Sequence, residues 1–157
     1  MEYATILIRI RQIVRSVNVE SKRLQKQYGI SIPQMLALNY LSRQPDFRAS
    51  HKQLKDFLQL NASTVTGIIS RLEAKGLIAR LPRHQDRRVA YVTITETGSG
   101  FLESLPEPMH ERISLRLKDL TTNELDELQA AFDTITRFLN IEVDHSAPIS
   151  AAEVASE

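Results

Sequence analysis

The amino-acid sequence predicts a mainly α protein with a small β-hairpin wing: a winged helix-turn-helix lobe joined to a helical dimerisation region. Three observations support this fold class. Residues 61–76 form a capped amphipathic helix, and a shorter helix ends only a few residues before it. Two strand-like runs of alternating apolar and polar residues follow directly. An arginine-rich loop separates the two runs, as expected for an exposed wing.

The predicted central helix begins and ends with clear capping signals. Asn61 is a good N-cap because its side-chain oxygen can accept an unpaired amide hydrogen of the first turn, and Gly76 suits a left-handed C-terminal stop. One face is apolar and carries Val65, Ile68, Ile69 and Leu72. The opposite face carries Ser63, Thr64, Thr66, Gly67, Ser70 and Arg71. These mostly small, hydrogen-bonding residues suit a helix whose first turns enter a groove.

Composition excludes several classes of function. A chain of 157 residues suits one core, or one small domain with helices that need a partner. The absence of cysteine excludes disulfides, thiolate metal sites and thiol-based redox sensing. No apolar run approaches the length of a membrane span, and charged residues interrupt the N-terminal segment, which we interpret as a helix and not a signal peptide. We found no phosphate loop, nucleophile elbow, paired acids or metal-ligand histidine spacing, so we expect no catalytic site, metal or cofactor.

Charge is distributed unevenly along the chain although the net charge is only +1. Residues 1–47 carry a net +4, and residues 48–88 carry +6, from nine Lys/Arg against three Asp/Glu. Residues 89–157 carry −9. Because the basic block coincides with the central helix and the wing, a polyanionic partner is expected there.

The elements before the central helix are predicted from periodicity and capping. Residues 3–27 form a long helix whose apolar side needs a second chain or the C-terminal helices to cover it. Ser31-Ile-Pro-Gln34 is a capping box that opens a second helix, which stops near Pro45. Ser50-His-Lys-Gln53 is another, and it opens the short helix before the central one.

The elements after the central helix begin with strands at 77–81 and 89–94, and the glycine-free loop 82–88 between them is predicted to be long and exposed. Thr95 caps the next helix, which Pro106-Glu-Pro108 must kink or break. Thr121-Thr-Asn-Glu124 is a third capping box and opens the last helix. We therefore expect a winged-helix domain at 31–95, a dimerisation region at 1–30 and 96–141, and a flexible acidic tail at 142–157.

Three segments of the sequence resemble the MarR family of bacterial transcription regulators. They are Leu58-Gln-Leu-Asn-Ala-Ser-Thr-Val-Thr-Gly-Ile-Ile-Ser-Arg-Leu-Glu-Ala-Lys-Gly-Leu-Ile-Ala-Arg80, Gln-Asp-Arg-Arg88 and Val-Thr-Ile-Thr-Glu-Thr-Gly98. The most specific part is the Asp-x-Arg of the wing, Asp86 and Arg88. In helix order the resemblance extends over roughly residues 3 to 140.

This resemblance implies a cytoplasmic homodimer whose first and last two helices interlock and which binds double-stranded DNA at an inverted-repeat operator. It also implies a pocket between lobe and dimerisation region, where small molecules can loosen DNA binding. We expect the effector to be a small aromatic or anionic compound that binds between the first two helices and the helix starting near Thr95. Two positions depart from the family pattern. Gln59 stands where the turn usually has glycine, and Gly67 stands where the recognition helix often has arginine.

The chemistry of the same residues also supports DNA binding. A helix fits the major groove, where Ser63, Thr64 and Thr66 could reach base edges or phosphates. Arg88 could enter the minor groove, held by Asp86 through a paired hydrogen bond. The expected DNA-binding set is Ser63, Thr64, Thr66, Gly67, Ser70, Arg71, Arg80, Arg83, Asp86, Arg87 and Arg88.

An alternative of a different class is a winged-helix protein-interaction module without DNA binding. In that case the Ser and Thr side chains would simply solvate a surface helix, and the arginines would protect an exposed strand edge. Four arginines concentrated in residues 80–88 favour DNA binding, because a module that does not bind DNA has little use for them.

Overall fold

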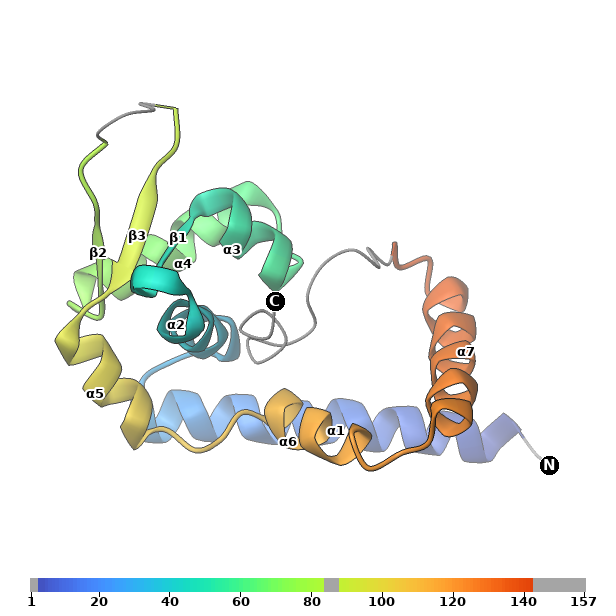
Figure 1. The fold of residues 1–157 in the computed structure, drawn as a ribbon. Coiled ribbons are helices and arrows are strands. Elements are labelled where there is room, and N and C mark those ends of the chain that lie inside the picture. Colours follow the sequence, from blue (N-terminus) through green and yellow to red (C-terminus); the bar gives the residue numbers. More distant parts are fainter. Residues whose placement is uncertain (1–2, 84–87, 143–157) are drawn as a thin grey trace.

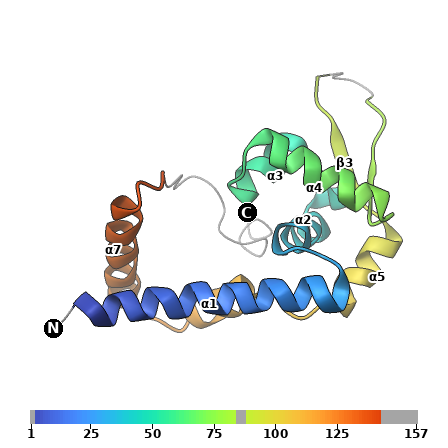
Figure 2. The same ribbon diagram turned by 180° about the vertical axis from the view of Figure 1, so that it is seen from behind.

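A long N-terminal helix organises the computed structural model, which describes residues 3–83 and 88–142 (Figure 1). One end of this helix carries a lobe of helices and strands, and the last helix stands near the other end (Figures 1 and 2). The elements are α1 (Tyr3–Tyr28), α2 (Ile32–Arg43), the 3-10 helix η1 (Pro45–Phe47), β1 (Arg48–Ser50), α3 (His51–Leu58), α4 (Ala62–Ala74), β2 (Ile78–Arg80), β3 (Tyr91–Ile94), α5 (Glu96–Ser104), α6 (Met109–Leu117) and α7 (Thr122–Phe138). The predicted acidic tail lies, from residue 143 on, outside the described residues.

The three predicted capping boxes are confirmed. In each, the N-cap hydroxyl accepts a hydrogen bond from the backbone N–H three residues later, and the side chain at that later residue accepts one from the N-cap N–H. The pairs are Ser31–Gln34, Ser50–Gln53 and Thr121–Glu124. The predicted break around Pro106 and Pro108 is also confirmed, since it separates α5 from α6.

The wing belongs to a three-stranded antiparallel sheet in the order β1-β3-β2, whereas periodicity had predicted only the β2–β3 hairpin. The missed strand, β1, follows a turn in which Asp46 and Phe47 both have positive φ angles, 57° and 55°. Non-glycine residues rarely adopt this left-handed conformation, so no residue pattern signals the turn or the short strand after it. β1 ties the start of α3 to the wing by pairing Ser50 with Tyr91.

The core lies inside the lobe, which we define as α2 to α5 with the three strands. Leu38 and Leu41 of α2 are fully buried, and Tyr40 stacks on Phe57 of α3 with ring centroids 4.5 Å apart. Helix α5 packs so closely on the lobe that a Cβ added at Gly98 would lie 2.0 Å from a backbone oxygen. Helix α5 therefore packs with the lobe core, although the sequence analysis assigned it to the dimerisation region.

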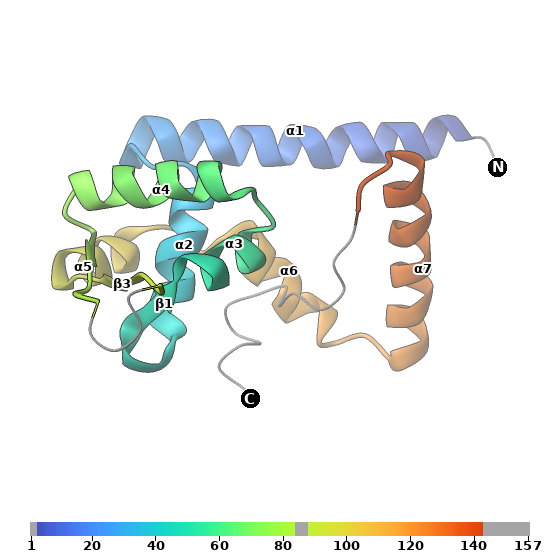
Figure 3. The ribbon, with the colours of Figure 1, turned by 90° about the horizontal axis from the view of Figure 1, so that it is seen from above.

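The remaining helices α1, α6 and α7, here called the frame, have almost no core of their own. Among their described side chains only Glu20, Leu24 and Glu111 are buried, and α7 contributes none. Figure 3 shows α7 roughly perpendicular to α1, near the N-terminal end of α1 and well away from the lobe. The large hydrophobic side chains that α1 and α7 expose are Tyr3, Ile6, Leu7, Ile8, Ile13, Val14, Val17, Val19, Leu125, Leu128, Phe132 and Phe138.

So much exposed apolar surface on two helices marks a protein-protein or membrane contact. In residues 3–83 and 88–142, every helix is too short or too polar to cross a lipid bilayer. We expect a second copy of the chain to cover the apolar faces of α1 and α7.

We expect removal of residues 121–157, which deletes α7, to leave the apolar face of α1 uncovered and to yield aggregated or unfolded protein. Removal of residues 143–157 alone should leave association unchanged and serves as the matched control. Size-exclusion chromatography with light scattering measures both. A folded monomer after the longer deletion would refute the interlocked frame.

Candidate nucleic-acid interface

Helix α4 presents its predicted polar face to solvent. Val65, Ile68, Ile69 and Leu72 are at most 3% exposed and pack into the lobe core. This burial fixes the rotation of α4 about its axis, because side chains on one helix keep fixed angular positions. The residues left on the outer face are Ser63, Thr64, Thr66, Ser70 and Arg71, with Gly67 half-buried among them.

Hydrogen bonds within the protein already use several groups at the start of α4. The Oδ1 atom of Asn61 accepts from the backbone N–H of Thr64 and from the hydroxyl of Ser63, both at 2.9 Å. The hydroxyl of Thr66 donates to the backbone oxygen of Ala62 at 2.9 Å, and Nε2 of His51 lies 3.0 Å from the same hydroxyl oxygen.

His51, the first residue of α3, is a site residue that the sequence analysis missed. It lies fifteen positions before Thr66, so no helical or strand spacing could have paired the two residues. The contact arises because α3 packs across α4 in the lobe.

Gly67 makes room for an arginine from the next turn. A Cβ added at Gly67 would lie 3.5 and 3.6 Å from the two terminal guanidinium nitrogens of Arg71. Arg71 therefore folds back over this position, where the family pattern often has an arginine of its own. A positive charge thus remains at this level of the helix although residue 67 is glycine.

The turn between α3 and α4 is left-handed without glycine. Gln59 has φ 54° and ψ 43°, and its side-chain amide donates to the backbone oxygen of Asp56 at 2.7 Å. A residue with a Cβ is strained in this conformation, so glutamine in place of glycine at position 59 lowers the stability of the turn. The left-handed shape that glycine would give the turn is kept.

The arginines of the wing have different surroundings. Arg80, at the end of β2, is paired with Glu73 of α4 at 3.2 Å, which partly neutralises its charge. Arg83 and Arg88 lie exposed at the two ends of the wing loop. Asp86 and Arg87 lie outside the described residues, so the expected pairing of Asp86 with Arg88 stays a prediction.

One cationic side chain that the sequence analysis did not single out lies on the sheet. The guanidinium carbon of Arg48, in β1, is 5.4 Å from the ring centroid of Tyr91, which is a cation–π distance. Lys75, at the end of α4, donates from its ammonium group to the backbone oxygen of Gly29.

A buried polar cluster joins the frame to the lobe. Asn39 of α2 donates to Glu111 of α6 at 3.1 Å and accepts from Arg43 at 3.4 Å. Arg112 lies 3.7 Å from Glu20, the buried carboxylate of α1. The sequence analysis missed this joint, since its members come from three helices far apart in the chain.

His110 lies at the edge of this joint, with Nε2 at 3.4 Å from an oxygen of Glu111. Burial lowers the pKa of His110, and it outweighs the opposing effects of Glu111 and Glu20, while Arg43 adds to the lowering. The neutral imidazole is therefore favoured in the folded protein.

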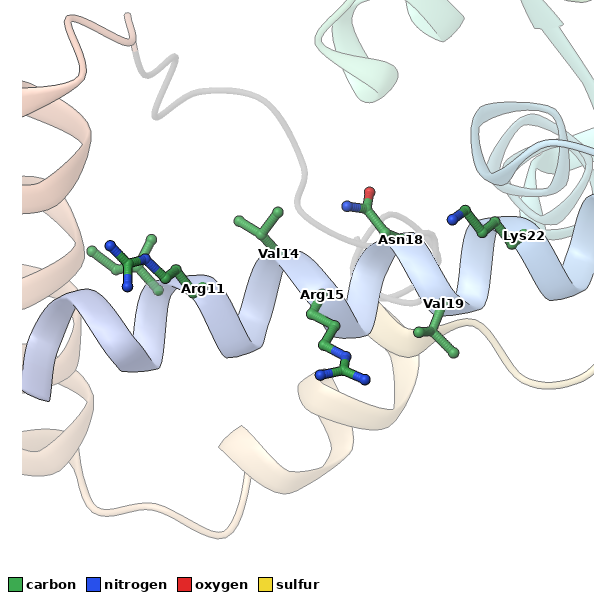
Figure 4. A pocket seen from close by; sticks show the side chains of 7 residues that line it. Arg11, Val14, Arg15, Asn18, Val19 and Lys22 are labelled. Carbon is green, nitrogen blue, oxygen red and sulfur yellow. The ribbon is translucent and has the colours of Figure 1, made fainter.

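Two shallow grooves run along α1. One has a volume of about 520 Å³, and its lining residues follow α1 from Ile10 to Lys22. Figure 4 shows Arg15 and Val19 of this groove on the side of α1 that faces α6. The second groove, of about 400 Å³, lies between α1 and α6 and combines arginines with Val19 and Met109. The described residues contain no cluster of three or more His, Asp or Glu side chains that could hold a metal ion.

Comparison with known proteins agrees with this architecture. Residues 30–90 match the model of the MarR family. The chain is 29% identical over 125 residues to the transcriptional repressor MprA of Escherichia coli K12, which covers 79% of this chain and 71% of MprA. It is similar to S. aureus MepR in a DNA complex (TM-score 0.64, 22% identity, 88% and 99% of the two chains). It is also similar to NadR in complex with 4-hydroxyphenylacetate (TM-score 0.57, 22% identity, 83% and 91%).

We expect His110 to make the stability of the protein depend on pH. Because its folded pKa is lowered, the unfolded chain takes up a proton near the ordinary value of about 6.5 while the folded chain resists it. The contribution of His110 to the free energy of unfolding is thus fully present above that value and is lost as the pH falls below it. Urea denaturation of wild type and His110→Gln at fixed protein concentration measures this. If both lose stability equally from pH 7.5 to pH 5.5, about one unit either side of the ordinary value, the buried imidazole does not resist protonation.

Proposed function

The chain belongs to the MarR family, and we propose that it is a dimeric, sequence-specific DNA-binding transcription regulator, acting as a repressor in the cytoplasm. Members of this family are transcription regulators and not enzymes, and we propose no catalytic role for the chain. The observation that carries the proposal is the outer face of α4, which lies beside a basic wing.

The recognition surface we propose combines α4 with the wing. The first turns of α4 expose small side chains and the helix N-terminus, whose backbone amides and positive dipole end favour a phosphate. Arg71, Arg83 and Arg88 would add positive charge along the same surface. Residues 48–88 carry a net +6, which supports a polyanion as the partner of this face.

The residues would have separate tasks. The major groove accepts a helix and displays a distinct pattern for each base pair, so α4 would read sequence there. Arg88 would enter the narrow minor groove beside it, where the potential is most negative. Arg80 contributes less than its charge suggests, because Glu73 already pairs with it.

The frame would bring two lobes together by a two-fold axis. The exposed apolar faces of α1 and α7 support this assembly, since a second copy is the simplest cover for both. A two-fold dimer with one recognition helix in each lobe would bind an inverted repeat with half-sites about 10 bp apart.

A small aromatic or anionic effector would modulate DNA binding through the groove between α1 and α6. This groove lies one helix further along the chain than the position expected beside Thr95. Arg15 and Arg23 supply positive charge, Arg112 lies beside its partner Glu20, and Val19 and Met109 supply apolar contact. Such a lining suits an aromatic carboxylate, the class to which the ligand of NadR belongs. An effector weakens DNA binding only if it prefers the lobe spacing that does not fit DNA.

We expect Arg88→Ala to weaken binding to specific and non-specific duplexes alike, because a minor-groove or phosphate contact reads little sequence. The slope of log affinity against log salt should flatten by about one for each phosphate that a wing no longer neutralises. Fluorescence anisotropy between about 50 and 200 mM salt measures both.

Lys118→Ala is the matched control, because it removes one positive charge from the α6–α7 connection, away from the wing. It should leave the salt slope unchanged. If wild type binds no duplex at any salt concentration, DNA binding is refuted and the protein-interaction module becomes the better hypothesis. If only Arg88→Ala has no effect, the wing does not contact DNA.

We expect 4-hydroxyphenylacetate or a similar aromatic acid to raise the melting temperature and to weaken the DNA complex. Arg15→Gln should reduce that thermal shift, because it removes a guanidinium from the groove. Arg9→Gln, on α1 but outside the lining of this groove, serves as the control. Equal thermal shifts in both variants would place the ligand elsewhere.

A further inference from the structure

The hydroxyl of Thr66 already donates its only hydrogen inside the protein. It donates to the backbone oxygen of Ala62 at 2.9 Å, one turn earlier in α4. Nε2 of His51 approaches the same oxygen at 3.0 Å. A hydroxyl carries one hydrogen, so both contacts are hydrogen bonds only if His51 donates from Nε2 and Thr66 accepts. The geometry thus selects the imidazole form with a hydrogen on Nε2.

These two hydrogen bonds leave the methyl group of Thr66 as the part of the side chain available to a partner. The side chain is exposed and has only two groups beyond Cβ, a hydroxyl and a methyl. With the oxygen held from two sides, the χ1 rotamer is fixed and the methyl takes a single position. The hydroxyl oxygen keeps one lone pair but has no hydrogen to donate.

Ser63, at the start of the same helix, also has a hydroxyl group that is already hydrogen-bonded within the protein. Its hydroxyl donates to Oδ1 of Asn61 at 2.9 Å, so its hydrogen is also used. Guanine N7 and O6, adenine N7 and thymine O4 need a donor from the protein. Two of the three hydroxyls expected to read bases therefore cannot serve these acceptors without breaking a hydrogen bond in the protein.

We propose that Thr66 reads the 5-methyl group of a thymine in the major groove through its own methyl, and that His51 is the positioning residue that holds this arrangement. The inference rests on the proposed DNA-binding function and deepens it, since it names the base feature that is read. Methyl-to-methyl contact is a recognised way to distinguish thymine from cytosine. Gly67, next to Thr66, has no side chain of its own, and the guanidinium of Arg71 lies over it.

His51 acts through Thr66 and not through the base. A donor at the position of Nε2 is all that this role requires. The side-chain amide of glutamine can supply such a donor, whereas alanine cannot. The pair His51→Gln and His51→Ala therefore separates the hydrogen bond from the mere presence of a side chain.

The test begins with a duplex selected from random DNA by the full-length protein. Each thymine of one half-site is then replaced in turn by deoxyuridine, which removes the 5-methyl and leaves base pairing intact. Wild type should lose about fourfold in affinity at one of these positions, the effect of losing one buried methyl-sized group. The other positions should show little change.

Side-chain variants then identify the contact by double-mutant cycles. Thr66→Ser keeps the hydroxyl and lacks the methyl, so it should bind the thymine duplex about fourfold more weakly and ignore the deoxyuridine substitution. Thr66→Val keeps a methyl in that position and should stay sensitive. His51→Gln should behave as wild type, and His51→Ala should lose most of the sensitivity. Circular dichroism melting confirms that all four variants are folded.

Three results would overturn the inference while leaving DNA binding intact. In the first, wild-type affinity does not change when deoxyuridine replaces thymine at any position. In the second, the affinity of Thr66→Ser is as sensitive to deoxyuridine as that of wild type. In the third, Thr66→Val binds the thymine duplex more weakly than wild type, and Thr66→Ser does not. The last would assign the contact to the hydroxyl oxygen. Equal behaviour of His51→Ala and wild type would remove His51 from the mechanism. A wild type that does not distinguish selected from scrambled duplex would refute the proposed function itself, and the inference with it.

Discussion

Burial of one face of α4 is the interaction on which the rest of the molecule depends. Four apolar side chains, at most 3% exposed, lock this helix into the lobe, and shortening a buried Leu or Ile to Ala typically costs about 2–5 kcal/mol in a core. The locked rotation decides which residues face outward, and the left-handed Gly76 at its end sends the chain straight into β2. The positions of the proposed recognition face and of the wing therefore follow from the same packing.

Local signals made much of this architecture predictable. Capping boxes, the proline break and the apolar stripe of α4 act over a few neighbouring residues, and all were confirmed. Strand β1 was missed because it depends on Asp46 and Phe47, two non-glycine residues in a conformation that favours glycine. The pairing of His51 with Thr66 was missed for a different reason: it needs two helices in contact, and no sequence spacing encodes that. The candidate face was thus predictable, but the state of its hydroxyl groups was not.

The joint between frame and lobe differs in kind from the core of the lobe. Glu20 and Glu111 are buried carboxylates, and burial of charge is costly unless partners compensate. One oxygen of Glu20 has no hydrogen-bond partner among the described residues, so the compensation is incomplete. A polar joint of this type can exchange its hydrogen bonds with water, whereas an apolar one cannot. This polar joint lies beside an apolar contact, because α1 also buries Leu24 in the lobe core.

The frame, which buries almost nothing by itself, ties folding to the amount of protein in the cell. The lobe core is formed within one chain, whereas the exposed apolar faces of α1 and α7 would gain cover only from a second chain. At low abundance the concentration of paired chains rises with the square of the number of chains, so a modest change in synthesis produces a larger change in active regulator. Chains that remain single expose long apolar helices and are open to proteases. A frame without its own core would thus make the amount of paired chain depend steeply on the amount of chain synthesised.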